Sequence, residues 1–197
     1  KLPAPDKKGS MSVEEAIQKR RSVRRYKDQA VSLKDVSQIL WAAGGITIDG
    51  VTGPTRAYAS AGLTYPLELY IVAGKVKDLD PGIYKYDSVE NTLILIRAGD
   101  LRKQLATATW GQGMVEDAPF TVVVMAEYER TASRYGKRGR DKYVPMDAGH
   151  LGQNVYLAAE SLGLGTVMVG AFREKDVSGV MQGAEGSPVY LIPVGKK

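Results

Sequence analysis

The chain has 197 residues, of which 44% are hydrophobic and 25% charged, so it can bury the core of one globular domain without covalent or metal cross-links. Cysteine is absent, which excludes disulfides, thiolate nucleophiles and cysteine-based metal sites, and with a single histidine we expect no bound metal. The net charge of +5 favours anionic partners such as phosphorylated cofactors.

The sequence shows neither a membrane-spanning segment nor a recognisable export signal. The longest apolar runs, such as residues 122–126, are far shorter than the ~20 residues that a membrane-spanning helix needs. We therefore expect a cytoplasmic protein with no membrane partner. Because the chain starts at Lys1 rather than Met, export is the alternative if a signal was removed before that residue.

The sequence contains no internal linker, repeat or low-complexity tract, which predicts a single domain over residues 12–197. Residues 1–11 are rich in proline and lysine and lack periodicity, so we expect them to lie as an arm across the surface.

The first predicted helix leads into a cluster of arginines. Ser12 is placed to cap this helix and Glu15 to complete a capping box, which puts Arg20 and Arg21 in the last turn. Guanidinium groups bind phosphate through paired charge-assisted hydrogen bonds, so the cluster predicts a site for a small anion. The alternative is that these cations only complement the helix dipole, which would explain one or two of them. The predicted anion ligands are Arg20, Arg21, Ser22 and Arg24.

A second predicted helix is capped by Ser32 and ends at residues 44–45, where two glycines follow each other. Residues 46–66 are rich in glycine and proline and predict a long loop, which is usually functional or flexible. Within it, the small residues 59–62 would let a ligand approach the backbone closely.

The rest of the chain alternates irregularly between strand and helix patterns, which predicts an α+β fold with a mixed sheet flanked by helices. The polar and basic residues 127–145 predict a mobile surface excursion, such as a lid. No G-x-G-x-x-G motif follows a strand, which argues against a Rossmann site. Strands are predicted over residues 67–73, 82–87, 92–97, 120–126, 166–169 and 189–194, and helices over residues 100–109, 147–162 and 174–181.

Three segments together resemble a known family. They are Arg-Arg-Ser-Val-Arg at residues 20–24, Ala-Ser-Ala-Gly-Leu-Thr-Tyr-Pro-Leu-Glu-Leu at residues 59–69, and Asp-Ala-Gly-His-Leu-Gly-Gln-Asn at residues 147–154. In this order and spacing they resemble the nitroreductase family of flavin enzymes, and within it the branch of SagB-type dehydrogenases and thiazole/oxazole-forming oxidases. The resemblance extends over nearly the whole chain, roughly residues 11–197.

This resemblance implies an intertwined α+β homodimer that binds FMN at the subunit interface. Ser60, Ala61 and Gly62 would approach the flavin from the partner subunit. The backbone N–H of Gly170, beside Val169, would lie near flavin N5, the atom that takes the hydride. The residues implied at the ribityl phosphate and the pyrimidine edge are Arg20, Arg21, Ser22, Arg24, Lys196 and Lys197.

The resemblance also implies a reaction. NADH or NADPH would reduce the bound FMN, and an electrophilic small-molecule acceptor, such as a nitro compound or quinone, would then take the electrons in a ping-pong cycle. No side chain needs to act as a nucleophile. The residues expected to contact substrate are Tyr65, Gln112, Arg134 and Tyr135.

One departure from the branch bears on its substrate. Azoline-oxidising relatives carry a Lys-Tyr pair before the long helix, where this chain has Arg134-Tyr135, with Lys142-Tyr143 as a second candidate. Arginine stays protonated and is a poor general base, which weakens the case for azoline-type peptide dehydrogenation and leaves it as an alternative. Ala59 also replaces the proline that opens the branch's Pro-Ser-Ala-Gly segment.

Other interpretations concern single residues and one segment. His150 is expected to pack or cap rather than catalyse, and Trp41 and Trp110 to pack in the core or an interface rather than line a flavin pocket. Residues 130–142 are basic and contain tyrosines, as in proteins that bind anionic polymers, but they lack a recognisable motif, so we expect no nucleic-acid partner. A flavin-binding carrier or sensor without turnover is a further alternative.

Overall fold

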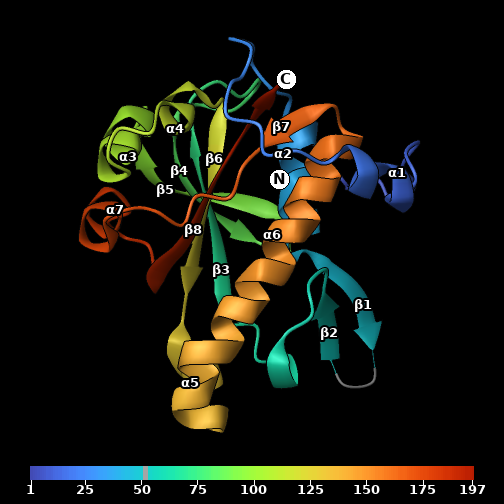
Figure 1. The fold of residues 1–197 in the computed structure, drawn as a ribbon, viewed down its shortest axis with the longest axis vertical. Helices are drawn as coiled ribbons and strands as arrows, with labels where there is room; N and C mark the ends of the chain where they lie inside the picture. Colours follow the sequence, from blue (N-terminus) through green and yellow to red (C-terminus); the bar gives the residue numbers. More distant parts are fainter. Residues whose placement is uncertain (51–52) are drawn as a thin grey trace.

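The structure is a computed structural model that describes residues 1–50 and 53–197. Its centre is a six-stranded sheet with the order β5-β4-β3-β6-β8-β7, in which every pair of neighbouring strands is antiparallel (Figure 1). Two isolated β-bridges outside these strand pairs, Ser22–Thr166 and Val31–Val76, are parallel. The strands are β3 (Leu67–Ala73), β4 (Gly82–Asp87), β5 (Thr92–Ala98), β6 (Phe120–Ala126), β7 (Leu164–Thr166) and β8 (Ser187–Lys196).

Helices cover both faces of this sheet, and each face has its own apolar core (Figure 1). One core joins alternate residues of β3, such as Leu69 and Ile71, to α2 (Leu33–Gly44) and α6 (Val144–Ser161). The other joins Tyr70 and Val72 to α3 (Arg102–Ala108) and α7 (Glu174–Val180). β6 is buried along its whole length, which explains its unbroken apolar sequence. Two short helices complete this part of the fold: α4 (Gly113–Asp117), and α1 (Val13–Lys19), which packs against α6.

The α+β fold is confirmed, and the strands and helices expected outside the two long polar segments are present, some with the expected bounds and others with shifted ends. The first helix ends earlier than expected, because the N–H of Arg20 closes on Ala16 O and its ψ of 126° leaves the helical region. Arg21 therefore lies beyond the helix. β7 begins two residues before the predicted strand, and α6 begins three residues before the predicted helix.

The prediction of an irregular loop over residues 46–66 is wrong for part of that segment. β1 (Ile46–Gly50) and β2 (Gly53–Arg56) form an antiparallel hairpin, and the hydroxyls of Thr47 and Thr55 lie 3.2 Å apart across it. A 3-10 turn, η1 (Ala61–Leu63), follows. Residues 51–52, which belong to the predicted loop, lie outside the described residues.

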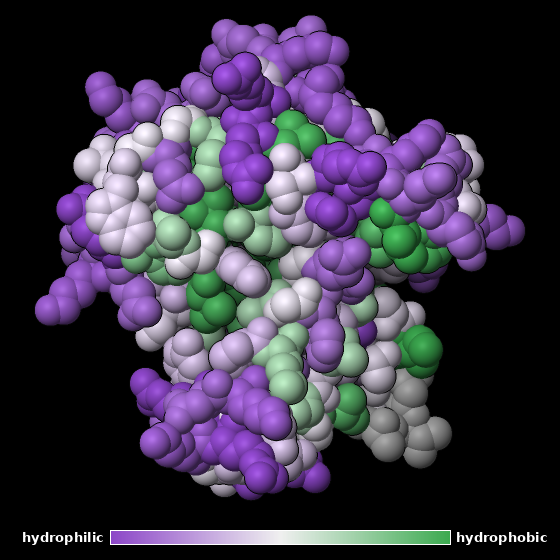
Figure 2. All heavy atoms as spheres, in the orientation of Figure 1, coloured by the Kyte–Doolittle hydropathy of each residue, from purple (hydrophilic) through white to green (hydrophobic). Residues whose placement is uncertain are grey.

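Residues 128–145 are mainly helical rather than irregular, with a kink at Gly136. They form α5 (Tyr128–Arg138) and a π-helical turn, η2 (Gly139–Tyr143), which runs directly into α6. α5 lies beyond the end of the sheet (Figure 1), and hydrophilic side chains cover it in Figure 2. Its packing explains the helix: Thr131 is buried, and Arg130 forms a 2.5 Å ion pair with Glu68 of β3.

The N-terminal residues pack along α2. Leu2 is buried, Ser37 Oγ donates to Pro3 O at 2.6 Å, and Gln38 exchanges two hydrogen bonds with the backbone of Asp6. No helix within the described residues combines the length and apolarity needed to cross a bilayer.

Candidate functional site

The arginine cluster continues into an extended segment that lies against the edge of the sheet. Val23 N donates to Thr166 O at 2.9 Å, and Lys27 N donates to Lys196 O at 2.8 Å, so residues 22–27 run beside β7 and β8. Two glycines make this approach possible. A Cβ on Gly165 would lie 2.6 Å from Val23 Cγ1, and a Cβ on Gly195 would lie 2.7 Å from Tyr26 Cγ. Any larger residue at either glycine would therefore push the basic segment off the sheet.

The predicted anion ligands have separate roles. Met168 N donates to Tyr156 Oη at 3.2 Å, which leaves the hydroxyl of Tyr156 free to donate to Ser22 Oγ at 2.8 Å. The guanidinium of Arg20 lies 5.0 Å from the centre of the Tyr156 ring, within cation–π range. Arg21 instead donates to two carbonyls at the end of α1, so the helix-end alternative holds for this residue. Arg24 is exposed.

The two C-terminal lysines have carboxylate partners. Lys197 Nζ lies 2.6 Å from Glu160, which is one helical turn after Tyr156 on α6. Lys196 Nζ lies 3.2 Å from Asp35 in the first turn of α2. Lys197 is therefore paired one helical turn from Tyr156, and a carboxylate partly balances the charge of each lysine.

The small-residue loop, residues 57–65, has a strained backbone. Gly62, Leu63 and Tyr65 have φ values of 59°, 57° and 42°, in the left-handed region that bulky side chains avoid. Such strain persists only where the surrounding structure enforces it, and it is concentrated at functional sites.

α6 holds the first half of this loop. The carboxylate of Asp147 accepts a 2.6 Å hydrogen bond from Ser60 Oγ, and Asn154 Nδ2 donates to Ala57 O at 2.8 Å. His150 Nδ1 lies 3.0 Å from Ala59 O and must be the donor, because a carbonyl only accepts. Asp147, His150 and Asn154 are spaced by three and four residues, so one face of the helix carries all three. Burial raises the pKa of Asp147, partly opposed by the hydrogen bonds from Ser60 and the Ala61 N–H.

α5 holds the second half of the loop. Arg130 Nη1 donates to Tyr65 O at 3.2 Å, and Arg134 Nη1 donates to Gly62 O at 3.1 Å. Between them, the hydroxyls of Thr131 and Thr64 lie 2.7 Å apart. We call these six side chains of two successive helices the loop clasp: Arg130, Thr131, Arg134, Asp147, His150 and Asn154.

The predicted substrate residues fall into two groups. Arg134 reaches the small-residue loop, Tyr65 belongs to it, and the Tyr135 hydroxyl lies against Gly62. Gln112 is elsewhere and donates to Ala171 O at 2.8 Å, beside exposed Gly170. Gly170 follows Val169, whose backbone exchanges two hydrogen bonds with Leu191.

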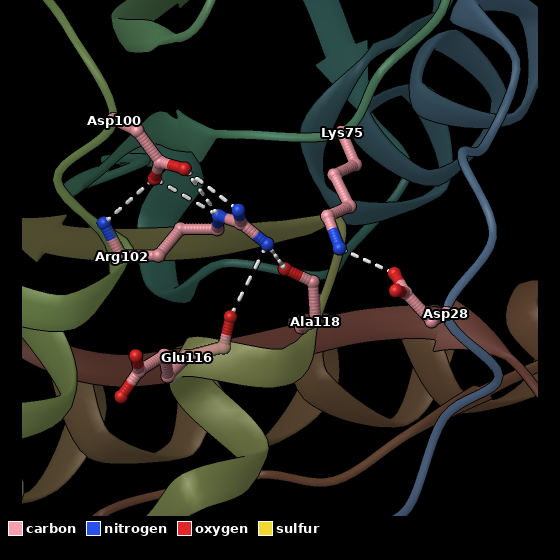
Figure 3. A network of polar contacts seen from close by, with 6 residues as sticks. All are labelled: Asp28, Lys75, Asp100, Arg102, Glu116 and Ala118. Atoms are coloured by element: carbon pink, nitrogen blue, oxygen red, sulfur yellow. Dashed lines mark hydrogen bonds and ion pairs between the residues drawn. The ribbon is translucent and has the colours of Figure 1, made fainter.

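Figure 3 shows a second polar cluster, which contains Lys75, two residues after the end of β3, and Arg102 of α3. Arg102 donates to the carboxylate of Asp100 and to the carbonyls of Glu116 and Ala118, and so closes the end of α4. Lys75 pairs with Asp28. Because both cations are paired with carboxylates of the protein, we assign this cluster a structural role.

Comparison with known proteins agrees with this geometry. The nitroreductase family profile matches residues 17–196, and a Methanocaldococcus jannaschii protein assigned to the nitroreductases is 40% identical over 187 residues, covering 95% of this chain and 92% of the relative. The chain belongs to the nitroreductase family. A crystal structure of a Ralstonia eutropha protein assigned to the same family is 29% identical, with a TM-score of 0.84, over 99% of this chain and 87% of that one. The E. coli microcin synthetase McbBCD complex shares the fold at 18% identity, with a TM-score of 0.75, over 100% of this chain and 78% of that one.

Four residues of this candidate site were not predicted from the sequence: Thr131, Asp147, Asn154 and Tyr156. A signal existed for two of them, because Asp147 and Asn154 repeat with His150 on one face of the helix. Nothing in the sequence marks Tyr156 or Thr131, whose partners are distant in the chain. His150 is exposed rather than packed in the core, and its ring donates a hydrogen bond to the loop. That it does not take part in catalysis stays a prediction.

Proposed function

We propose that this protein is an FMN-dependent oxidoreductase, in which NADH or NADPH reduces the flavin and a nitro compound, a quinone or a similar acceptor reoxidises it. The observation that carries the proposal is the charge of residues 20–25. Four of these six residues are arginines, and among the described residues no carboxylate forms an ion pair with any of them. Cations held together without counter-ions favour a bound anion, and the ribityl phosphate of FMN supplies one.

The donors present fit this cofactor. Arg20 and Arg24 offer guanidinium groups to the phosphate, and Ser22, oriented by Tyr156, offers a hydroxyl. Exposed Gly170 carries no side chain that would keep a planar ring away from its backbone N–H. When bound, FMN supplies the hydride chemistry, so the protein's task is to orient the ring and stabilise its charge.

A homodimer forms part of the same proposal. Asp147, at the small-residue loop, and Tyr156, at the arginine segment, are nine residues apart on α6, or about 14 Å along its axis. This separation supports the two regions serving different flavins, one in each subunit. A cavity of about 560 Å³ lies between the N-terminal segment, α1, α2 and α6, and beside it Val13 and Ile17 of α1 are 64% and 57% exposed. Hydrophobic surface is visible beside α1 in Figure 2, as expected for a face that a partner covers.

Azoline-type dehydrogenation of a peptide is less well supported. A base would be needed near the loop, and Arg134 there donates to Gly62 O. The likeness to the microcin synthetase complex is one of fold alone. The alternative that the protein only carries flavin, without turnover, is distinguished from an enzyme by the experiment below.

The test uses purified protein to which FMN is added, with an absorbance spectrum recorded before and after anaerobic addition of NADH or NADPH. We expect tight FMN binding and loss of the visible flavin band, followed by its return when a quinone is added. Binding without bleaching would favour the carrier. Folded protein that binds no FMN would contradict the proposal.

A further inference from the structure

Trp110 combines two unusual features. Its side chain is 62% exposed, although tryptophan is among the most apolar and bulky residues. Its φ is 54°, and Gly111 follows with φ 75°, so a bulky residue occupies the left-handed region where glycine or asparagine is usual. This left-handed φ belongs to the residue after the C-cap of α3, where the N–H of Gly111 closes the helix end on Ala106 O.

The turn that carries Trp110 is well ordered by hydrogen bonds. The carbonyl of Ala106 accepts from Thr109 N and Gly111 N, both at 3.0 Å, and from Thr109 Oγ1 at 2.7 Å. Thr109 is fully buried, and Gln112 N donates back to its carbonyl at 3.4 Å. The exposed indole therefore sits on a fixed support rather than on a loose loop.

The same turn is fastened to the segment that follows Gly170. On one side of Trp110, Arg173 N donates to Ala108 O at 3.0 Å. On the other side, Gln112 Nε2 donates to Ala171 O at 2.8 Å. The two contacts bracket Trp110, so its backbone is tied on both sides to the residues next to Gly170.

We propose that Trp110 is a specificity-determining residue, an aromatic platform on which a planar, electron-poor acceptor such as a quinone or nitroaromatic ring stacks. This inference rests on the proposed function, which places Gly170 at the reacting edge of the flavin. Tryptophan offers a wide, rigid π-face, and stacking on it favours flat aromatic rings over acceptors without one. The exposure follows from this role, since the indole must face a ligand instead of the core.

The first test measures the binding of an acceptor to the protein without any turnover. The chain has two tryptophans, and Trp41 is partly buried with its Nε1 donating to Ile46 O at 3.2 Å. In FMN-loaded Trp41→Phe protein, all indole emission comes from Trp110. We expect menadione to reduce the acrylamide quenching of this emission saturably. Trp110→Phe protein, which reports on Trp41 alone, is the matched control and should show no such change.

The second test compares acceptors. Trp110→Ala should lower kcat/KM for menadione about tenfold, Trp110→Phe should retain most of it, and kcat/KM for ferricyanide, which has no ring to stack, should change less than twofold in both. Flavin reduction by NAD(P)H serves as the internal control, and the thermal unfolding midpoint reports folding.

Equal loss with both acceptors, no loss with either, or conversion of a dimer to monomers by Trp110→Ala would overturn the inference while leaving the proposed function standing. A wild-type protein that binds no FMN would overturn both.

Discussion

The carboxylate of Asp147 accepts a 2.6 Å hydrogen bond from the hydroxyl of Ser60, 87 residues earlier in the chain. The same hydroxyl accepts from Tyr65 N at 3.0 Å, so it closes the loop on itself as well as on α6. One buried side chain therefore helps to hold a loop in which Gly62, Leu63 and Tyr65 all have positive φ. The flavin role proposed for Ser60 to Gly62 thus depends on a residue outside the loop.

Replacing Asp147 separates the geometry of this contact from its charge. Asp147→Asn keeps an oxygen that can accept from Ser60, whereas Asp147→Leu does not. We expect the Kd for FMN of Asp147→Asn to stay within about threefold of the wild-type value. Asp147→Leu should raise the Kd about tenfold, because one buried hydrogen bond is lost. Flavin fluorescence titration measures both.

Hydrogen exchange of the Tyr65 amide provides a readout that does not need flavin. The amide should stay protected in wild type and Asp147→Asn, and lose protection in Asp147→Leu and in Ser60→Ala, which removes its acceptor. Equal damage by Asn and Leu would show that the charge of Asp147, rather than its geometry, holds the loop.

The pH dependence of stability provides a separate prediction for Asp147. Burial raises the pKa of this carboxyl above its ordinary value of 3.8, so the folded protein holds the proton more tightly than the unfolded chain. The contribution of Asp147 to stability is therefore fully present below pH 3.8 and is lost as pH rises through the raised folded-state pKa. Asp147→Asn removes this dependence.

The free energy of unfolding of the Asn variant relative to wild type should accordingly increase between about pH 3.5 and neutral pH, and then level off. Urea denaturation of both proteins at a series of pH values measures it. A difference that is constant with pH, or that shrinks as pH rises, would contradict the assignment.

Much of the fold could be predicted because it follows from local patterns. β3, β4 and β6 match their expected bounds, since each is a short apolar or alternating run between turn residues. The two corrected segments depend on distant residues. α5 is basic and lacks a continuous apolar face, so its sequence does not predict a packed helix. It is anchored by contacts to Glu68 and Thr64, which are more than 60 residues away in the sequence.

The candidate site divides in the same way. The arginine cluster and the small-residue loop stand out in the sequence, because four arginines in six residues and four small residues in a row are unusual. The loop clasp could not be predicted as a unit, because the contact from Arg134 to Gly62 spans 72 residues and that from Asn154 to Ala57 spans 97. Side-chain pairs at such separations are defined by tertiary packing.

Tyr156 is expected to orient Ser22 toward the phosphate. Tyr156→Phe removes the 2.8 Å contact to Ser22 Oγ and leaves Met168 N without its acceptor, while keeping the ring beneath Arg20. We predict an increase of about five- to tenfold in the Kd for FMN, with a loss of about 1 kcal/mol in unfolding free energy. Ser22→Ala in the same background should add little, since the pair acts together. Fully additive losses would show that the two hydroxyls act independently.

The close approach of the basic segment to the sheet should depend on Gly165. A Cβ there would meet Val23, whose branched side chain and hydrogen-bonded backbone leave little room to adjust, at 2.6 Å. Gly165→Ala should therefore displace residues 22–24 and weaken FMN binding at least tenfold, with a destabilisation of about 1–3 kcal/mol from overpacking. Gly179→Ala in α7 is the matched control, because its added methyl group meets nothing within 4 Å and favours the helix. If both variants bind FMN as wild type does, the position of the arginine segment on β7 does not determine the affinity.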